Sequence, residues 1–385
     1  MPFTSPARGE RTTAILGVAL GVLFALCFVT GVTSHLIQHP PGWFHWPARP
    51  VWLYRWNQGI HVFAGIAAIP VLLAKLWSVY PNLYQRPLLR SAAHAIERAA
   101  IVPLLGGALL LLVTGLMNIA YWYGWRFDFI KTHFWTAWIV AGALIIHLGA
   151  KLPVVRRALA RNGGEAGASG PEAAPVAAGM GVGVGVERRR FLLTVGAAAG
   201  TLLLVTAGEA ATPLRRLNVL APRRQGVGPQ GLPVNKDARS ARVAGLLHDP
   251  GWRLVVSGRV ARPAALSLDD LRARMAGGMG HAARLPIACV EGWSQEAHWR
   301  GVRLRDLLDE VGAPSGAMVR VQSVQRGGFS TSVLNPAHAR HPDTLLALEL
   351  NGAALDPDHG YPVRLIAPNL PGVLQTKWLG ELMVL

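Results

Sequence analysis

Five apolar runs, each long enough to cross a lipid bilayer, constrain the fold of this chain most strongly. They cover roughly residues 13–34, 58–80, 99–121, 133–152 and 191–208. About 20 apolar residues in an α-helix span a hydrocarbon core that is ~30 Å thick. Hydrophobic residues make up 51% of the 385, yet the formal net charge is +17, so the basic residues must be separated from these runs. The sequence therefore predicts a membrane protein with a soluble part.

Arginine and lysine residues beside the runs predict the orientation of the chain. They precede the first run, separate the second from the third, and separate the fourth from the fifth: Arg8, Arg11, Arg86, Arg90, Arg98, Lys151, Arg156, Arg157, Arg161, Arg188, Arg189 and Arg190. Positive residues stay in the cytoplasm, so these segments are predicted to lie inside. Residues 35–57 and 122–132 carry few positive charges and many Trp and Tyr rings, which favour the headgroup level. We therefore expect a multi-pass inner-membrane protein whose last segment is periplasmic.

A tract rich in Gly, Ala and Pro, residues 158–187, separates the fourth run from the fifth. Such a composition buries too little apolar surface to offset its ordering entropy, so we expect a disordered cytoplasmic linker. The next residues, ERRRFLLTVGAAAGTLLL, resemble a twin-arginine export signal, here internal. They also fit a fifth membrane helix with positive residues on its inner flank. Both interpretations of residues 188–210 stay open.

The soluble part, residues 211–385, is predicted to be a strand-rich α+β domain. Its short runs contain β-branched residues, as in RLVVSGRV and MVRVQSV, and Gly, Pro and Asp turns separate them. One amphipathic helix is predicted at LRDLLDEVG. The basic residues lie beside apolar runs and form no aromatic-basic motif, so nucleic acid is not an expected partner.

Cys289, in the stretch RLPIACVEGWS, is the only cysteine of the soluble part. The other cysteine of the chain, Cys27, lies in an apolar run, which excludes a disulfide within the chain. Three roles stay open for Cys289: a buried inert side chain, a nucleophile, or a ligand of a soft transition metal. The small residues Ala288 and Gly292 beside it leave room for a large ligand near the backbone.

A resemblance to a known family favours the third role. IACVEGWS, the later W-x-G-V-x-L-x-x-L-L, and LALELNGAALDPDHGYPVRLIAPNLPGVLQTKWLGELMVL resemble the catalytic core of the sulfite-oxidase-fold molybdenum enzymes. The segment, residues 232–385, is most similar to bacterial periplasmic methionine-sulfoxide reductase catalytic subunits. The resemblance implies that Cys289 binds molybdenum, together with the two dithiolene sulfurs of one molybdopterin.

Further cofactor-binding residues follow from the same resemblance. It implies a position near the pterin for Asn235, a place in the HG-x-P-x-RL block for His359 and Arg364, and a phosphate-binding loop at Gln375, Thr376 and Lys377. Cationic side chains suit a phosphate anion. The sequence departs from sulfite oxidases, because no arginine pair follows Cys289 and the only tyrosine of the domain is Tyr361. A sulfite site built from cations and a tyrosine is therefore not expected, although sulfite-dehydrogenase-like oxidation of a small substrate stays an alternative.

Histidines in the apolar runs predict a second redox centre. His61 begins the second run and His133 the fourth, so two imidazoles lie at similar depth and can bind a haem iron from both faces. His35 lies at a similar level and can replace either ligand. His147 follows His133 by 14 residues, about 21 Å along a helix, a spacing found with two stacked haems. Because Lys75 occupies the matching position in the second run, one haem b is expected, while histidines that only hydrogen-bond between helices remain the alternative.

The segments around these histidines also resemble four-helix bacterial cytochrome b domains. The expected architecture is an all-α transmembrane four-helix bundle, residues 1–157, the linker, a fifth transmembrane helix, and an α+β sulfite-oxidase-type molybdopterin domain. The expected function is that of an oxidoreductase that exchanges electrons between membrane quinone and a small periplasmic substrate, through haem b and molybdenum. Reduction of an S-oxide or N-oxide is favoured. Oxidation of a small substrate, or a non-catalytic haem-anchored redox sensor, are the alternatives.

Overall fold

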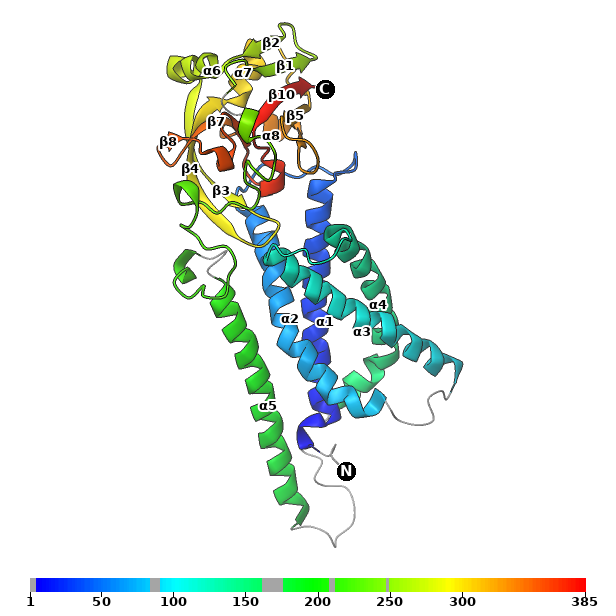
Figure 1. Ribbon diagram of the computed structural model, residues 1–385. Coiled ribbons are helices and arrows are strands. Elements are labelled where there is room, and N and C mark those ends of the chain that lie inside the picture. Colours follow the sequence, from blue (N-terminus) through cyan, green and yellow to red (C-terminus); the bar gives the residue numbers. More distant parts are fainter. Residues whose placement is uncertain (1–4, 84–90, 161–175, 208–211, 247–248) are drawn as a thin grey trace. The chain divides into compact units, whose positions relative to one another are not determined.

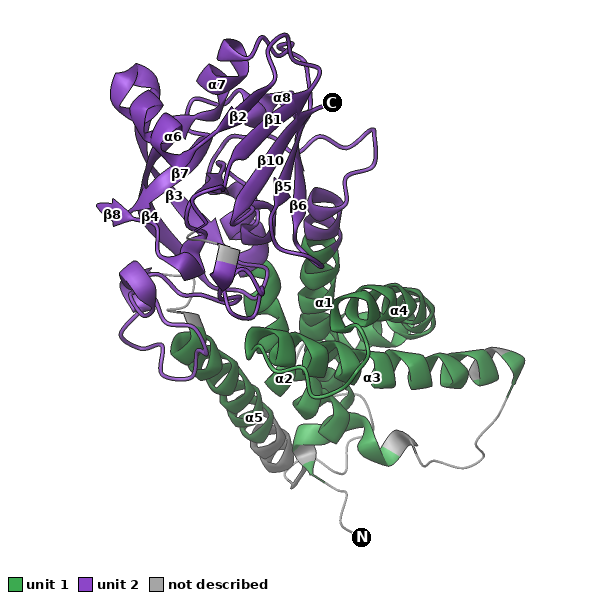
Figure 2. Cartoon of the chain, turned by 45° about the horizontal axis from the view of Figure 1, so that its top comes forward, with its two compact units in different colours: residues 1–31, 60–206 green, residues 32–59, 207–385 purple. Residues whose placement is uncertain are grey.

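The computed structural model describes residues 5–83, 91–160, 176–207, 212–246 and 249–385 (Figure 1). The chain forms two compact units (Figure 2). Unit 1 comprises residues 1–31 and 60–206, and unit 2 comprises residues 32–59 and 207–385. Residues 32–59, which the sequence placed in the membrane domain, are thus grouped with the strand-rich segment.

The N-terminal half of the chain is helical. After a short 3-10 turn at Pro6–Arg8, its long helices are α1 (Glu10–Gln38), α2 (Leu53–Leu83), α3 (Ala92–Ile119), α4 (Phe129–Ala160) and α5 (Val176–Ala207). Each predicted apolar run lies within one of these helices, apart from a residue or two at its end. All five helices have the length and hydropathy of a membrane span.

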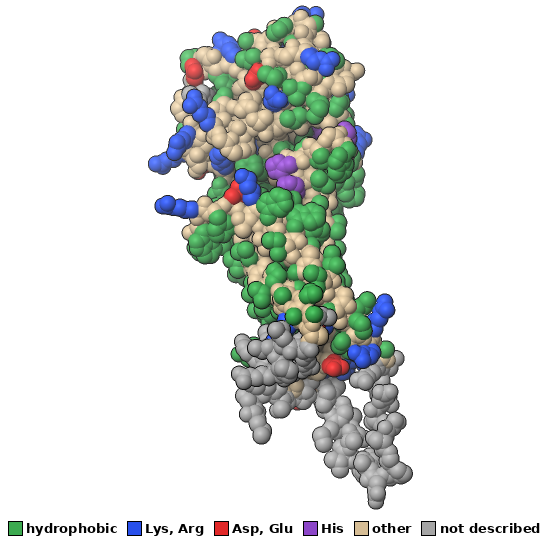
Figure 3. Space-filling model, turned by 90° about the vertical axis from the view of Figure 1, so that its right-hand side faces the viewer, with side chains coloured by type: hydrophobic (Ala, Val, Ile, Leu, Met, Phe, Trp, Pro, Cys, Tyr) green, Lys and Arg blue, Asp and Glu red, His purple; other side chains and the backbone are tan. Residues whose placement is uncertain are grey.

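The surface of these helices is apolar. Val29 is 63% exposed, Val102 is 73% exposed and Ile145 is 70% exposed. Figure 3 shows hydrophobic side chains covering the helical part of the molecule in that view. Water penalises an apolar surface of this extent, whereas lipid tails solvate it. The helices therefore expose the side chains that a membrane requires.

Helix α5 begins earlier than the sequence analysis predicted. Residues 161–175 of the expected linker lie outside the described residues, and α5 starts at Val176, directly after Pro175 in the sequence. Proline is common at or just before the first turn of a helix, because its missing N–H would have no intrahelical partner there. The three consecutive arginines 188–190 therefore lie inside a helix rather than at its first residue.

Unit 2 contains two five-stranded sheets. One has the order β2 (Ala264–Leu266), β1 (Leu254–Gly258), β10 (Leu379–Val384), β5 (Val319–Ser323) and β6 (Thr331–Leu334). The other has the order β3 (Gly280–Ala288), β4 (Ser294–Arg303), β7 (Leu345–Leu350) and β8 (Ala353–Ala354), and β9 (Arg364–Ile366) also pairs with β7. All pairs are antiparallel except β1 with β10. The predicted strand-rich domain is confirmed.

Side chains from both sheets form one core. It joins Val256 and Val321 of the first sheet to Val302 and Leu346 of the second. Three short helices lie between the strands: α6 (Leu268–Arg274), α7 (Leu304–Glu310) and α8 (Pro336–Ala339). Helix α7, which the sequence predicted, buries Leu304, Leu307 and Leu308 at the i, i+3, i+4 spacing of one helix face. Burying each leucine contributes about 2 kcal/mol.

The hairpin of β3 and β4 positions the cysteine. Its register runs without a break from Gly280 opposite Val302 to Ala288 opposite Ser294, so Cys289 begins the turn. The backbone N–H of Cys289 donates to the carbonyl of Trp293 at 2.8 Å. Gly292 has φ of +104°, a conformation that L side chains rarely adopt, so the turn needs glycine there. The sequence thereby fixes Cys289 at the buried end of a long hairpin.

Candidate active site

Cys289 is buried, with 6% of its surface exposed, and an amide from a distant loop contacts its sulfur. Asn235 Nδ2 donates to Cys289 Sγ at 2.9 Å. The amide orientation is fixed because Asn235 Oδ1 accepts from Trp293 Nε1 and from Arg223 Nε, each at 3.1 Å. An N–H donor aimed at the sulfur stabilises the thiolate form, which is the form that binds metals.

Glu291 is a second ionisable group at this turn. It is 6% exposed, and its Oε2 atom has no hydrogen-bond partner among the described residues. Burial raises the pKa of the Glu291 carboxyl to about 7, against a smaller lowering by the charge of Arg223. Sequence reasoning did not single out Glu291 or Arg223. Glu291 stood in the quoted CVE motif, whereas nothing in the sequence signalled Arg223.

Two cationic side chains come from neighbouring segments: Arg364 begins strand β9, and Lys377 lies in the loop before β10. Arg364 is 2% exposed and its guanidinium donates to the carbonyls of His359 at 2.9 Å and Gln375 at 3.2 Å. Lys377 Nζ donates to the carbonyls of Asp358 at 2.7 Å and Lys236 at 2.9 Å. Burial lowers the pKa of Arg364 to about 9 and that of Lys377 to about 7. Neither forms an ion pair with a carboxylate in the described part of the chain, so their charge is available to an anion.

The other predicted residues support these cations. His359 is 1% exposed, its Nε2 contacts the carbonyl of Pro229 at 2.7 Å, and burial lowers its pKa to about 4. Gln375 Nε2 donates to the carbonyl of Leu370 at 3.1 Å, and its Oε1 has no partner among the described residues. Thr376 Oγ1 contacts Ser332 Oγ at 2.7 Å. A side chain at Gly360, where φ is +110°, would press on Arg364 and Lys377.

One short segment connects the sulfur to the cations. Asn235 contacts Cys289, and the carbonyl of the next residue, Lys236, accepts from Lys377. The structure therefore gathers all seven predicted residues of the soluble part around one region: Cys289, Asn235, His359, Arg364, Gln375, Thr376 and Lys377. A soft donor and two cations without carboxylate partners fit a metal cofactor that carries a phosphate.

His61 and His133 lie close together within unit 1, with ring centres 6.2 Å apart and ring planes at 62° to each other. His61 Nδ1 lies 2.9 Å from the carbonyl of Cys27 and 3.1 Å from Thr30 Oγ1. His133 Nδ1 lies 2.9 Å from Thr114 Oγ1. A carbonyl can only accept a hydrogen bond, so a neutral His61 carries its proton on Nδ1. The lone pair of Nε2 is then available to bind a metal.

Both threonines belong to a short repeated sequence that the sequence analysis missed. Thr30 in α1 and Thr114 in α3 each follow valine and precede glycine, in CFVTGV and LLVTGL. A Cβ at Gly31 would come within 3.1 Å of His61 Cε1, and one at Gly115 within 3.8 Å of His133 Cε1. Each histidine thus packs against a Thr-Gly pair of a neighbouring helix, and the repeat was the available signal.

The two remaining histidine candidates have different surroundings. The ring of His35 lies 4.8 Å from that of His39 at the end of α1. His147 Nδ1 is buried without a hydrogen-bond partner among the described residues. Lys75, the position that argued against a second haem, donates to the carbonyl of Thr13 at 2.6 Å. Lys75 therefore holds α2 against α1 at the position where a second haem would need a histidine.

Comparison with known proteins matches the strand-rich segment to one family. Residues 242–385 match the model described as an oxidoreductase molybdopterin binding domain. The uncharacterized oxidoreductase YuiH of Bacillus subtilis is 33% identical over 129 residues, 33% of this chain and 62% of YuiH. The protein-methionine-sulfoxide reductase catalytic subunit MsrP of Ralstonia nicotianae is 36% identical over 142 residues, 33% of this chain and 42% of MsrP. Sulfite oxidase of Arabidopsis thaliana is 29% identical over 168 residues, 36% of this chain and 43% of that enzyme.

The buried cysteine lies in a segment that matches an oxidoreductase molybdopterin binding domain. Residues 242–385 are thus homologous to parts of MsrP, sulfite oxidase and YuiH. The chain spans less than two thirds of the length of each of these three relatives. The predicted resemblance to molybdopterin oxidoreductases and the prediction of an enzyme domain are confirmed.

Proposed function

We propose that this protein exchanges electrons between membrane quinone and a small substrate through haem b and molybdenum, and that it reduces an S-oxide or N-oxide. The contact of Asn235 Nδ2 with Cys289 Sγ at 2.9 Å, inside the matched domain, supports this most strongly. The name of MsrP, a methionine-sulfoxide reductase, supports the choice of an S-oxide. The match to sulfite oxidase supports a second candidate, the oxidation of a small substrate with electrons passing to the membrane.

In this proposal the residues of unit 2 hold and orient the cofactor. Cys289 is the protein ligand of molybdenum, and the amide of Asn235 keeps its sulfur in the thiolate form. Arg364 and Lys377 bind the pterin phosphate, with His359, Gln375 and Thr376 lining that region. When it is bound, the molybdenum of the molybdopterin cofactor would supply oxygen-atom transfer, a reaction that moves two electrons. Reduction of an S-oxide consumes two electrons and two protons and releases a sulfide and water.

Haem b is the proposed partner of His61 and His133. The two imidazole rings, whose centres lie 6.2 Å apart, would hold the haem iron as its two protein ligands. Hydrogen bonds to the Nδ1 atoms orient both rings, and such bonds raise the basicity of the ligand nitrogens. A bound haem supplies one-electron transfer, so two successive electrons are needed for each substrate.

Quinone is the proposed electron partner, and polar side chains inside unit 1 support it. Lys151 Nζ pairs with Glu97 Oε1 at 2.6 Å, and His147 interacts electrostatically with both and with Lys75. Glu97 and Lys151 lie at the ends of the third and fourth apolar runs that are predicted to face the cytoplasm, and ionisable residues in membrane helices are costly and mark functional sites. Lys75 of α2 and His147 and Lys151 of α4 can donate hydrogen bonds to quinone oxygens, whereas the carboxylate of Glu97 in α3 can only accept. The four-helix arrangement of α1 to α4 is therefore proposed to be a b-type cytochrome module.

The catalytic domain is proposed to face the periplasm, with α5 as a membrane helix whose arginines resemble a twin-arginine signal. A reporter fused after Leu385 is expected to be active only on the outer side. A reporter inserted in residues 161–175 is expected to be active only in the cytoplasm, because positive flanks stay inside. The opposite pattern would overturn both the orientation and the localisation.

The molybdenum and haem b content of the purified protein tests the proposed function. Detergent-solubilised full-length protein is expected to contain one molybdenum and one haem b per chain. Elemental analysis and reduced-minus-oxidised spectra measure the two independently. Molybdenum without haem would leave the helices as an anchor, and haem without molybdenum would contradict the catalytic site.

A further inference from the structure

Residues 32–59, here called the docking segment, pack against the molybdopterin domain within unit 2. Asn369 holds the segment by three hydrogen bonds and is 4% exposed. Its Oδ1 accepts from the Tyr54 N–H and its Nδ2 donates to the Pro47 carbonyl, each at 2.7 Å. Its carbonyl accepts from Trp46 Nε1 at 2.8 Å. A buried side chain with every polar group bonded indicates a specific interface rather than a loose contact.

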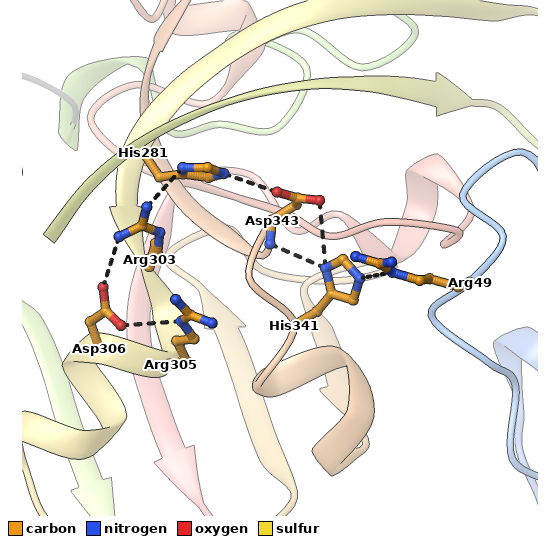
Figure 4. Close-up of polar contacts among 7 residues, drawn as sticks. All are labelled: Arg49, His281, Arg303, Arg305, Asp306, His341 and Asp343. Carbon is orange, nitrogen blue, oxygen red and sulfur yellow. Dashed lines mark hydrogen bonds and ion pairs between the residues drawn. The ribbon is translucent and has the colours of Figure 1, made fainter.

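Charged side chains extend the interface. Arg49 Nε lies 3.0 Å from His341 Nε2, and the backbone N of Asp343 lies 3.1 Å from His341 Nδ1, and a neutral imidazole accepts at one of these two nitrogens. Figure 4 shows the chain of contacts continuing from Asp343 to His281 and on to Arg303. Arg49 is the member that comes from the docking segment. The segment is thus tied to the hairpin β3–β4 and to the residues before β7.

The same segment holds the turn that carries Cys289. Gln58, which is 6% exposed, donates from Nε2 to the carbonyl of Val290 at 2.7 Å. Ala288, on the other side of Cys289, forms an apolar cluster with Ile37 and Tyr54. Ala288 also bridges to Pro371, two residues after Asn369. Both neighbours of the cysteine are therefore contacted by the docking segment.

A short relay fixes the side chain of Gln58. The Tyr54 hydroxyl donates to Gln58 Oε1 at 3.5 Å and contacts Ser34 Oγ at 3.1 Å. Tyr54 is 1% exposed, so it cannot move without opening the interface. With its Oε1 turned to Tyr54, Gln58 must present its N–H to Val290. Val290 follows Cys289 directly in the turn that the Cys289 N–H closes by donating to the carbonyl of Trp293.

We propose that Gln58 is a positioning residue for the molybdenum ligand, acting through the carbonyl of Val290. This inference rests on the proposed role of Cys289 as that ligand. It means that the docking segment, which joins α1 to α2, is part of the molybdenum site. Groups that orient a metal ligand change activity by roughly 10–100-fold when they are removed. An unsatisfied buried carbonyl would also let the turn relax.

The test compares Gln58→Met with Gln322→Met in the full-length protein. Methionine keeps the length of glutamine but donates no hydrogen bond. Gln322 lies in β5 of the other sheet, where its side chain contacts the carbonyl of Ser323 and the hydroxyl of Thr331. The readouts are the Mo(V) electron paramagnetic resonance spectrum and kcat per molybdenum. Reduced benzyl viologen is the donor and methionine sulfoxide the acceptor.

Gln58→Met is expected to alter the Mo(V) spectrum and to lower kcat roughly tenfold, whereas Gln322→Met should match the parent. If Gln58→Met is not recovered with its cofactors, Gln58→Leu also donates no hydrogen bond and is expected to show the same changes. A parental Mo(V) spectrum and kcat in the recovered variant would overturn the inference, even if its stability fell. Failure of the proposed function is distinguished separately, because Cys289→Ser would then leave the molybdenum spectrum unchanged.

Discussion

Cys289→Ser is expected to abolish turnover while the haem spectrum stays that of the parent. A serine hydroxyl is a harder and far less polarisable ligand than a thiolate, so the metal loses its soft protein donor. Even changes outside the ligand shell cost roughly 10–100-fold, so loss of the ligand itself should exceed that range. Activity with methionine sulfoxide, molybdenum content and the Mo(V) spectrum are the measurements.

Asn235→Leu is the matched comparison for that result. It removes the N–H that contacts the sulfur but keeps the thiolate itself. We expect it to retain molybdenum and to lose part of the activity. If Cys289→Ser kept parental activity or a parental Mo(V) spectrum, Cys289 would not be the ligand.

His61→Ala and His133→Ala are expected to abolish quinol-linked turnover while dye-linked turnover stays near normal. Each change removes one of the two neighbouring imidazoles, so the haem should be lost or become five-coordinate, with a shifted spectrum. Unit 2 has its own core and its own cofactor contacts, so it should stay folded. A soluble donor should therefore still reduce its molybdenum site.

Controls distinguish the haem ligands from other histidines. His298→Ala changes an exposed residue of β4 and should leave both activities unchanged. His35→Ala and His147→Ala should keep the haem spectrum. If only one of these two removed it, the module would stand but the choice of ligands would be wrong. Normal quinol-linked rates in His61→Ala and His133→Ala would contradict the proposal that a haem bound by these histidines carries the electrons.

The elements set by local sequence were predictable. The apolar runs gave the long helices, because membrane-spanning length and composition leave few alternatives. The quoted motif around Cys289 indicated a turn, and the structure has a hairpin there whose register runs from Gly280 to Ala288 on β3. The seven site residues came from a resemblance rather than from local pattern, and the structure gathers them in one region of unit 2.

Contacts between distant segments were not predictable from local pattern. Gln58 and Val290 are 232 residues apart, and Trp46 and Asn369 are 323 apart. Neither side of such a contact carries a periodic signal, because hydrogen bonds to backbone carbonyls place no demand on the partner's side chain. Residues 35–57 were predicted to be an interfacial loop because of their tryptophans, yet Trp46 donates from its ring nitrogen to the carbonyl of Asn369. Thr30 and Thr114 were missed because threonine is ordinary in an apolar helix.

Electron exchange between haem and molybdenum is the central claim, and reoxidation of the haem by substrate tests it most directly. The full-length protein is reduced without oxygen until its haem is ferrous, excess reductant is removed, and methionine sulfoxide is added. The account predicts that the haem spectrum returns to the oxidised form in the parent and stays reduced in Cys289→Ser. A haem that stays reduced in molybdenum-loaded parent protein, with methionine sulfoxide reduced at normal rates by a dye, would contradict it.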